Sequence, residues 1–455
     1  MHSGLIQVCD LHRLHCLPKE IFGTRDRGRP RRAGADALFR KADAVWYGKS
    51  RLGIFPDSCH YRCQGYFALR NGYLGLPGSA PLQQNEGGMS ALFTPFRIGS
   101  LELSNRIIIA PMCQYSAVGG CMIDWHLIHL GHLALSGAAL LTVEATAVTP
   151  EGRITDADVG LYDDATEAAM ARTLESVRRW SDIRIAVQLA HAGRKASTEV
   201  PWKGGRQIRP GQPNGWQTLA PSAIPFDEGQ NPPATLDREG LKSVREAFAA
   251  SARRAARLGV DGVQLHGAHG YLLHQFLSPL SNRREDEYGG SLENRMRFPL
   301  EVFDAVRAVF PAERPVSMRV SGTDWMAGGW DIDQTIEFAK ALEAHGCAAI
   351  HVSSGGLTPA QKIPVGPSYQ VPLARAVKMN ARLPVIAVGL ITAFDQAEAI
   401  IGTGDADLIA LARTILFDPR WPWHAAAHFG AKVKAPDQYL RSQPRQYRDL
   451  FDIGH

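Results

Sequence analysis

The chain has 455 residues, 45% of them hydrophobic, with 50 Lys and Arg side chains against 45 Asp and Glu. This composition is ordinary for a soluble globular protein, and no apolar run approaches the roughly 18 residues that a membrane-spanning helix needs. Seven irregularly spaced cysteines argue against a disulfide framework, so we expect a cytoplasmic protein without a membrane partner.

The first fifth of the chain differs from the rest in charge. Residues 1–88 hold 13 basic and 7 acidic side chains, whereas the remainder holds 37 basic and 38 acidic ones. A small zinc site around "CHYRC", beginning at Cys59, and a basic nucleic-acid arm are alternatives here, but the other early cysteines lack regular zinc spacing. We expect residues 1–88 to be a basic extension that is disordered or not part of the natural protein, and we expect no nucleic-acid partner for the rest.

From Met89 onward the periodicity becomes regular. "LFTPFRIGSLELSNR" alternates around a central Gly-Ser and predicts a hairpin. Eight short apolar runs follow in chain order, with helical patterns such as "REGLKSVREAFAASARRAARLG" between most of them. The runs are RIIIAP, LLTVEA, IAVQLAH, DGVQLHGA, VSMRVSG, AIHVSS, PVIAVG and DLIALAR. Eightfold alternation of buried strands and helices predicts an α/β fold, a (β/α)8 TIM barrel over residues 89–455, with an open doubly wound sheet as the alternative.

Polar side chains follow nearly every predicted strand, where a barrel places its active site. The two histidines after the fourth run, His266 and His269, could bind a metal ion, but Arg319 and Arg413 at neighbouring strand ends disfavour a cation. We therefore expect no metal. Gly389 and Arg413, after the last two strands, lie where barrels often bind phosphate, which favours a phosphate-bearing cofactor.

Several stretches resemble one known family. They are "PMCQYSA", "VEATAVTPEGRITDADVGLYDD", "QLAHAGRKA", "APSAIPF", "HGAHGYLLHQFLSPLSNRREDEYGGSLENRMRF", "MRVSGTDW" and "ADLIALARTILFDPRWPW". Together they are similar to the old yellow enzyme family of flavin-dependent ene-reductases, nearest to its bacterial branch with a cysteine beneath the flavin, which includes xenobiotic reductases. The resemblance runs from about Leu92 to Arg441, and nothing in residues 1–88 shares it.

The resemblance implies an FMN-binding barrel that takes hydride from NADPH or NADH and reduces an activated alkene such as an enone, maleimide or nitroalkene. It implies that Cys113 touches the flavin ring, that Gln188 bonds its pyrimidine edge, and that Arg319 stabilises the reduced ring. The other implied cofactor contacts are Ala110, Pro111, Met112, Ala145, Gly389, Ala412 and Arg413.

The same resemblance implies the catalytic groups. His266 and His269 would donate hydrogen bonds to the substrate oxygen, and Tyr271 would protonate the α-carbon. Tyr115 and Trp325 would line the pocket, and Arg441 would reach the neighbouring subunit of a homodimer or homotetramer.

Two alternatives stay open within the same fold. A dienoyl-type reductase would need a cysteine cluster after the barrel, and no cysteine follows Cys347. A non-catalytic flavin-binding barrel would have lost the oxygen ligands or the proton donor, yet His266, His269 and Tyr271 are all present. The sequence distinguishes neither the physiological substrate nor NADPH from NADH.

Overall fold

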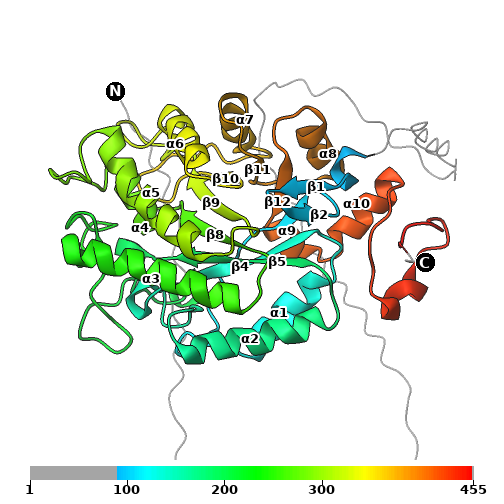
Figure 1. Cartoon of the computed structure of the whole chain (residues 1–455), viewed down its shortest axis with the longest axis horizontal. Coiled ribbons are helices and arrows are strands. Elements are labelled where there is room, and N and C mark those ends of the chain that lie inside the picture. Colours follow the sequence, from blue (N-terminus) through cyan, green and yellow to red (C-terminus); the bar gives the residue numbers. More distant parts are fainter. Residues whose placement is uncertain (1–89, 453–455) are drawn as a thin grey trace, which may run out of the picture. The chain divides into compact units, whose positions relative to one another are not determined.

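The computed structural model of the chain describes residues 90–452 (Figure 1). The predicted basic extension, residues 1–88, and its "CHYRC" pair lie outside the described residues. At the start of the described part, the Glu398 carboxylate accepts hydrogen bonds from the Ser90 hydroxyl and from the backbone N–H groups of Ala91 and Leu92. Glu398 therefore anchors the first described residues onto helix α8 (Phe394–Gly402).

Eight parallel strands close into a barrel in the order β3, β4, β5, β8, β9, β10, β11 and β12. Each corresponds to one predicted apolar run, so the barrel prediction is confirmed. Their bounds are β3 Ile107–Ile109, β4 Leu140–Ala147, β5 Arg184–Ala190, β8 Gly262–Gly267, β9 Val316–Ser321, β10 Ile350–Ser353, β11 Val385–Ala387 and β12 Leu408–Leu411. The strands read as continuous apolar runs because both of their faces are buried.

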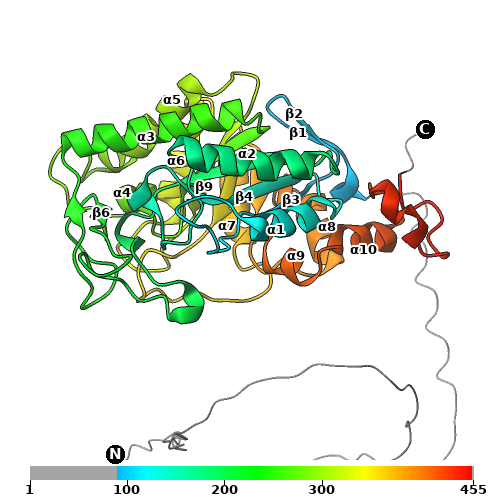
Figure 2. The ribbon, with the colours of Figure 1, turned by 90° about the horizontal axis from the view of Figure 1, so that it is seen from below.

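The helices surround the strands, as Figures 1 and 2 show for α2, α3, α5 and α6. Their bounds are α1 Asp124–Ala134, α2 Asp164–Arg178, α3 Arg238–Arg257, α4 Leu272–Leu277, α5 Leu292–Val309, α6 Ile332–Ala344, α7 Val371–Asn380, α8 Phe394–Gly402, α9 Arg413–Phe417 and α10 Trp421–Phe429. Helix α3 shows why they form: Asp237 caps it by accepting from the Gly240 N–H, and one face buries Leu241, Val244 and Phe248.

The predicted hairpin, β1 (Phe96–Ile98) and β2 (Leu101–Leu103), closes one end of the barrel. Ile98 and Leu103 are buried in a cluster with the barrel-interior residues Ile108, Leu140 and Ile386. These apolar side chains cover the end where the strands begin, and the predicted site residues follow the strands at the opposite end.

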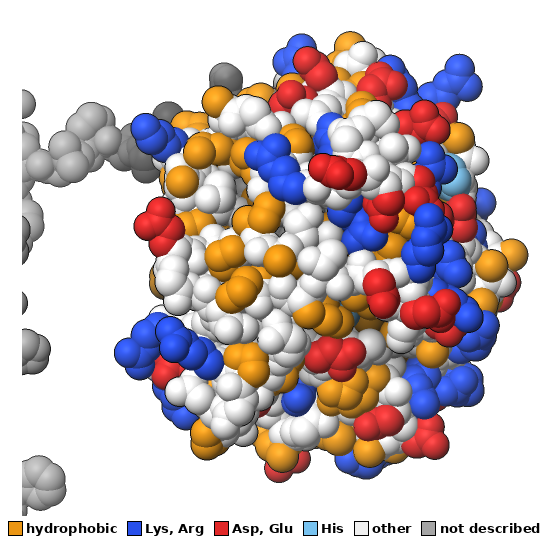
Figure 3. Space-filling view, turned by 90° about the vertical axis from the view of Figure 1, so that its left-hand side faces the viewer, with side chains coloured by type: hydrophobic (Ala, Val, Ile, Leu, Met, Phe, Trp, Pro, Cys, Tyr) orange, Lys and Arg blue, Asp and Glu red, His pale blue; other side chains and the backbone are white. Residues whose placement is uncertain are grey.

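The remaining regular elements lie in connections. A two-stranded sheet, β6 (Leu219–Ala220) with β7 (Ala234–Thr235), belongs to the long segment between β5 and β8. Within residues 90–452, no helix is both long and apolar enough to cross a membrane. On the face that Figure 3 shows, Lys and Arg side chains are interspersed with Asp and Glu side chains.

Candidate active site

Strand register brings the predicted polar residues together at one end of the barrel. Ala145 on β4 pairs with Gln188 on β5, and Gln188 pairs with Gln264 on β8. On the next strands, His266 pairs with Arg319, which in turn pairs with His351. Paired residues of neighbouring strands point to the same face, so these side chains share the barrel interior.

His266, on β8, and His269, in the loop after β8, meet edge to face. Their ring centroids are 5.1 Å apart, and the His266 Nε2 lies 3.4 Å from the His269 Nδ1. The His266 Nδ1 accepts from the Ala268 N–H at 3.3 Å, which leaves the proton of a neutral His266 ring on Nε2. The His269 Nε2 lies 2.7 Å from the Ser353 hydroxyl. When that hydroxyl donates to Nε2, the proton of His269 is on Nδ1, and the two N–H donors are then on nitrogen atoms 3.4 Å apart.

Both imidazoles are uncharged at neutral pH. Burial lowers the pKa of His266 and of His269 well below its ordinary value, and the nearby Arg319 guanidinium lowers both further. A neutral imidazole remains a hydrogen-bond donor through its single N–H, so this pair suits a polarised carbonyl or nitro oxygen.

Tyr271 stands at the start of α4, next to this pair. Its ring meets the His266 ring edge to face at a centroid distance of 4.8 Å. Burial raises the pKa of Tyr271 well above its usual value, so the phenol is protonated across the neutral range and can serve as a proton donor.

His269 is held in a strained backbone conformation. Its φ is +58°, in the left-handed region that non-glycine residues rarely occupy. The His269 N–H donates to the Ser321 hydroxyl at 3.0 Å, and its carbonyl accepts from the Lys195 ammonium at 2.8 Å. Lys195 also donates to the Gly356 carbonyl at 2.9 Å, and therefore joins the loops that follow β8 and β10. Burial lowers the pKa of Lys195 to about 8.

The loop after β3 carries Cys113 and Tyr115, and the buried acidic side chain of Glu144 supports it. Glu144 accepts from the Gln114 N–H at 2.8 Å, and its other oxygen lies 3.6 Å from the His126 Nε2 of α1. The β4–β5 register shifts between Val143 and Ala145, so Glu144 lies at an irregularity of the strand pairing. Burial raises the pKa of Glu144 to about 8. Burial, together with the nearby acidic side chains, also raises the pKa of the Cys113 thiol, which favours the protonated form.

Arg319 is a buried cation without a protein partner for its Nε among residues 90–452. Burial lowers its pKa to about 10, so it stays charged at neutral pH. A buried charge without a partner is costly, and an acceptor or negative charge on a bound group would satisfy it. The electron-poor flavin ring, which gains negative charge on reduction, fits this position.

The predicted phosphate end of the site is more open. Arg413 is exposed at the start of α9, and no hydrogen bond or ion pair within the described part of the chain involves it. Gly389 has a φ of +123°, and a Cβ there would lie 2.5 Å from the Gln370 Nε2. Both the backbone angle and the Gln370 side chain therefore require glycine at this position.

The other predicted residues divide into two groups. Ala110 and Ala145 are buried, and Pro111, Met112, Cys113 and Ala412 are half-buried at strand ends, consistent with a cofactor above the barrel. Tyr115 and Trp325, like His269, have positive φ angles, +49° and +54°. Arg441 does not join this set: it is exposed on the 3₁₀ segment Asp437–Ser442, whose Tyr439 packs against Trp423 of α10.

Four residues that contact the predicted site residues, or each other beside them, were assigned no individual role in the sequence analysis. They are Lys195, Gln264, Ser353 and His351. Lys195 lies in the "GRK" stretch directly after β5, and a lysine so close to a strand end was the available signal. The other three lie within apolar strand runs, and a polar residue inside such a run marks an inward-facing position.

Comparison with known proteins agrees with this arrangement. The sequence profile of the NADH:flavin oxidoreductase / NADH oxidase family matches residues 91–431. The chain is 43% identical to an NADPH dehydrogenase of Bacillus licheniformis over 353 residues, covering 77% of this chain and 98% of that protein. A second NADPH dehydrogenase, from Geobacillus thermodenitrificans, is 42% identical over 354 residues and covers the same shares of the two chains.

Solved structures give the same result. Morphinone reductase in complex with tetrahydroNAD superimposes with a TM-score of 0.62 at 29% identity, over 80% of this chain and 99% of that one. The old yellow enzyme homologue from Zymomonas mobilis has the same TM-score at 26% identity, over 79% of this chain and 99% of that one. The chain therefore belongs to the NADH:flavin oxidoreductase / NADH oxidase family, the old yellow enzymes, and is an FMN-dependent NAD(P)H dehydrogenase.

Proposed function

We propose that the enzyme reduces the C=C bond of activated alkenes, namely enones, maleimides and nitroalkenes, in the manner of the cysteine-containing bacterial branch. The observation that carries this proposal is the meeting of two neutral imidazoles and one protonated phenol at the end of β8, with ring centroids 4.8–5.1 Å apart. FMN, when bound, supplies the hydride-transfer chemistry.

The chain's own groups have separate tasks in this proposal. His266 and His269 donate to the carbonyl or nitro oxygen, which withdraws electrons from the adjacent double bond and stabilises the charge that develops on the oxygen. Tyr271 delivers a proton to the α-carbon. Arg319 adds a fixed positive charge to the cavity, so the imidazoles need not be protonated.

The proposed cofactor contacts are those the resemblance implied. They are Ala110, Pro111, Met112, Cys113, Ala145, Gln188, Arg319, Gly389, Ala412 and Arg413. Tyr115 and Trp325 would border the substrate, and Arg441, which is exposed on its own subunit, would serve a neighbouring site in a homodimer or homotetramer. We propose a cytoplasmic location for this enzyme.

Substitutions at the end of β8 test the proposal. His266→Ala and His269→Ala each remove one donor, which should slow enone reduction about 10²–10³-fold and weaken the binding of phenol, whose oxygen imitates the developing charge. Tyr271→Phe removes only the acid, so the NAD(P)H-consuming half-reaction should keep its rate while enone reduction slows. Nitroalkenes should be affected less, because their nitronate products are stable without protonation.

Stopped-flow measurement of the two half-reactions separates these outcomes. His424→Ala on the surface of α10 and Tyr288→Phe, whose hydroxyl contacts Glu301, are matched controls and should leave both rates unchanged. Equal slowing of both half-reactions by Tyr271→Phe would mean that Tyr271 orients the nicotinamide or packs the site, and the assignment of Tyr271 as the acid would be wrong.

A further inference from the structure

A polar chain lies inside the barrel, where bulky apolar side chains are the rule. The Gln188 Nε2 donates to the Gln264 Oε1 at 2.8 Å, and the Gln264 Nε2 lies 3.5 Å from the His351 Nδ1. All three side chains are almost fully buried, with exposed fractions of 1%, 4% and 0%. Buried amides are kept in a core only when their hydrogen-bonding groups are paired, so this chain has a defined direction.

The direction of the chain follows from the Gln188–Gln264 hydrogen bond, in which the Gln188 NH2 group donates to the Gln264 Oε1. The Gln264 NH2 group then faces the His351 Nδ1. Burial and the neighbouring Arg319 keep the His351 ring neutral by lowering its pKa, and the tautomer with its proton on Nε2 accepts from Gln264 through Nδ1. The Gln264 Oε1 therefore faces Gln188, whose NH2 group donates the hydrogen bond between the two amides. The Gln188 Oε1, at the β5 end of the chain, is left without a hydrogen-bond partner among residues 90–452.

We propose that Gln264 is a positioning residue that holds the Gln188 amide with its oxygen facing the cofactor, where it accepts from the N–H of the flavin pyrimidine ring. This inference rests on the proposed placement of FMN beside Gln188. The pyrimidine edge of a flavin has one N–H between two carbonyl groups, so an acceptor opposite that N–H is complementary. A rotated amide would instead set an NH2 group against it, and affinity would fall about tenfold.

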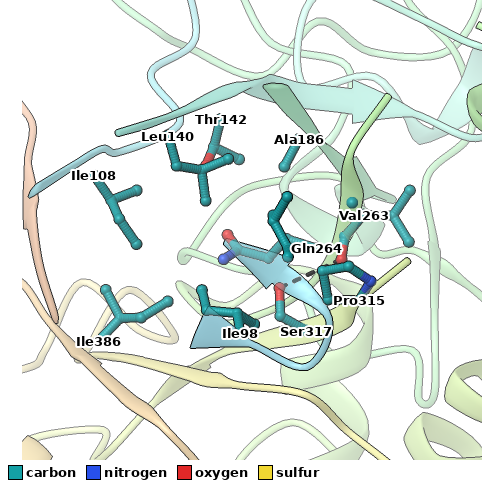
Figure 4. Close-up of a pocket in the computed structure, with 12 residues that line it drawn as sticks. Ile98, Ile108, Leu140, Thr142, Ala186, Val263, Gln264, Pro315, Ser317 and Ile386 are labelled. Atoms are coloured by element: carbon teal, nitrogen blue, oxygen red, sulfur yellow. Dashed lines mark hydrogen bonds between the residues drawn. The ribbon is translucent and has the colours of Figure 1, made fainter. Parts of the chain in front are cut away.

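The cavity below Gln264 supplies controls. It lies between the hairpin and the barrel strands, and Figure 4 shows Gln264 lining it together with Thr142, Ser317 and Ile98. The Ser317 hydroxyl donates to the Val263 carbonyl. Neither Thr142 nor Ser317 has a hydrogen bond to Gln188 within the described residues, so Thr142→Val and Ser317→Ala disturb the same cavity without touching the chain.

The test is a double-mutant cycle on FMN affinity. The Kd is measured from the fluorescence of FMN released on dilution of the full-length holoenzyme, for wild type, Gln188→Leu, Gln264→Leu and the double variant. We expect each single change to raise the Kd about tenfold. The double variant should lie within about twofold of Gln188→Leu, since Gln264 acts only through Gln188. Gln264→Glu, which keeps an oxygen for the Gln188 NH2 group, should restore the Kd to within about threefold of wild type, and the two cavity controls should not change it.

Each outcome decides the matter. An unchanged Kd in Gln264→Leu alongside a raised Kd in Gln188→Leu overturns the positioning role and leaves the placement of FMN intact. Additive effects in the double variant also overturn it, because Gln264 would then act by another route. An unchanged Kd in Gln188→Leu overturns both this inference and the proposed placement of FMN. Should Gln264→Leu fail to fold, Gln264→Met makes the same comparison with an unbranched side chain.

Discussion

Replacing Lys195 by Met should affect the activity of the site more than the stability of the fold. The Lys195 ammonium donates to the carbonyls of His269 and Gly356 at 2.8 and 2.9 Å. Methionine matches the unbranched stem but has no donor. The two carbonyls would lose their partner, and His269 would lose one of the contacts that hold its φ at +58°.

The expected change in stability is modest because two effects oppose each other. Two unpaired, partly buried carbonyls cost up to about 1–3 kcal/mol each. Against this, burial has already lowered the pKa of Lys195 from 10.5 to about 8. Keeping the ammonium charged in the fold at pH 7 therefore costs about 3 kcal/mol, which the methionine variant avoids. We expect a net loss of at most about 3 kcal/mol in the free energy of unfolding at pH 7.

The pH dependence of this difference has a defined sign. The folded-state pKa of Lys195 lies below its unfolded value, so between pH 8 and pH 10.5 the unfolded chain binds more protons than the folded one. The wild type should therefore gain up to about 3 kcal/mol relative to Lys195→Met as the pH rises through this window. Guanidinium unfolding of both proteins at pH 7 and pH 10 measures the change.

The expected change in function is larger. A left-handed His269 stores about 1–3 kcal/mol of strain, and without Lys195 the backbone can relax and move the imidazole away from the substrate oxygen. Phenol affinity and the rate of enone reduction should fall by at least about tenfold. Lys203→Met, at an exposed position, should change neither quantity. A stability loss above about 4 kcal/mol with phenol affinity unchanged would make Lys195 a purely structural residue and refute the reasoning.

Three further predictions concern the cofactor side of the site. A protein that begins at Met89 should keep the FMN content and turnover of the full chain, because every proposed site residue lies beyond residue 89; FMN-free protein from this start would contradict that. Cys113→Ala should retain FMN but shift its reduction potential, since the sulfur would act on the ring and not on the phosphate; an unchanged potential in redox titration would make Cys113 an inert core thiol. Glu144→Gln should speed the alkylation of Cys113 by iodoacetamide above pH 8 but not at pH 6, because the pKa of Glu144 is about 8 and only its charged form opposes the thiolate. Peptide mass analysis of the labelled protein measures the rate of alkylation. If Glu144→Gln and the wild type are alkylated at the same rate above pH 8 as well as at pH 6, the charge of Glu144 does not affect the thiol.

The barrel and the position of its site could be predicted because they depend on short-range patterns. Each of the eight strands is largely buried on both faces, so it appears in the sequence as a mainly apolar run, and a polar residue at its end stands out. The hairpin alternates because only one of its faces is covered, as the burial of Ile98 and Leu103 shows. These signals need no knowledge of which strand lies beside which.

The contacts that give the site its chemistry depend on register and could not be predicted in the same way. Gln188 and Gln264 are 76 positions apart, and Gln264 and His351 are 87 apart, so their meeting follows from the barrel's closure and not from any local pattern. The register shift beside Glu144 could not be predicted either, because every residue of β4 is buried and its sequence gives no indication of where the pairing shifts. The two carbonyls that bind Lys195 belong to loops whose conformations are set by their neighbours.

The charges of the site explain why the histidines can remain neutral. A protonated imidazole would bind a developing oxyanion more strongly, but its charge would be lost or gained within the physiological pH range. Arg319 keeps its charge throughout that range, since its pKa is lowered only to about 10. Burial lowers the pKa of His266 and of His351, and Arg319, which lies beside both in the β8–β9–β10 register, lowers each further. One permanent cation therefore supplies the positive potential, and the neutral rings supply directed N–H donors and an acceptor. If protonated histidines supplied the positive charge instead, hydrogen bonding in the site would depend on pH. A protonated His351 would also have no acceptor at Nδ1 and could not orient Gln264.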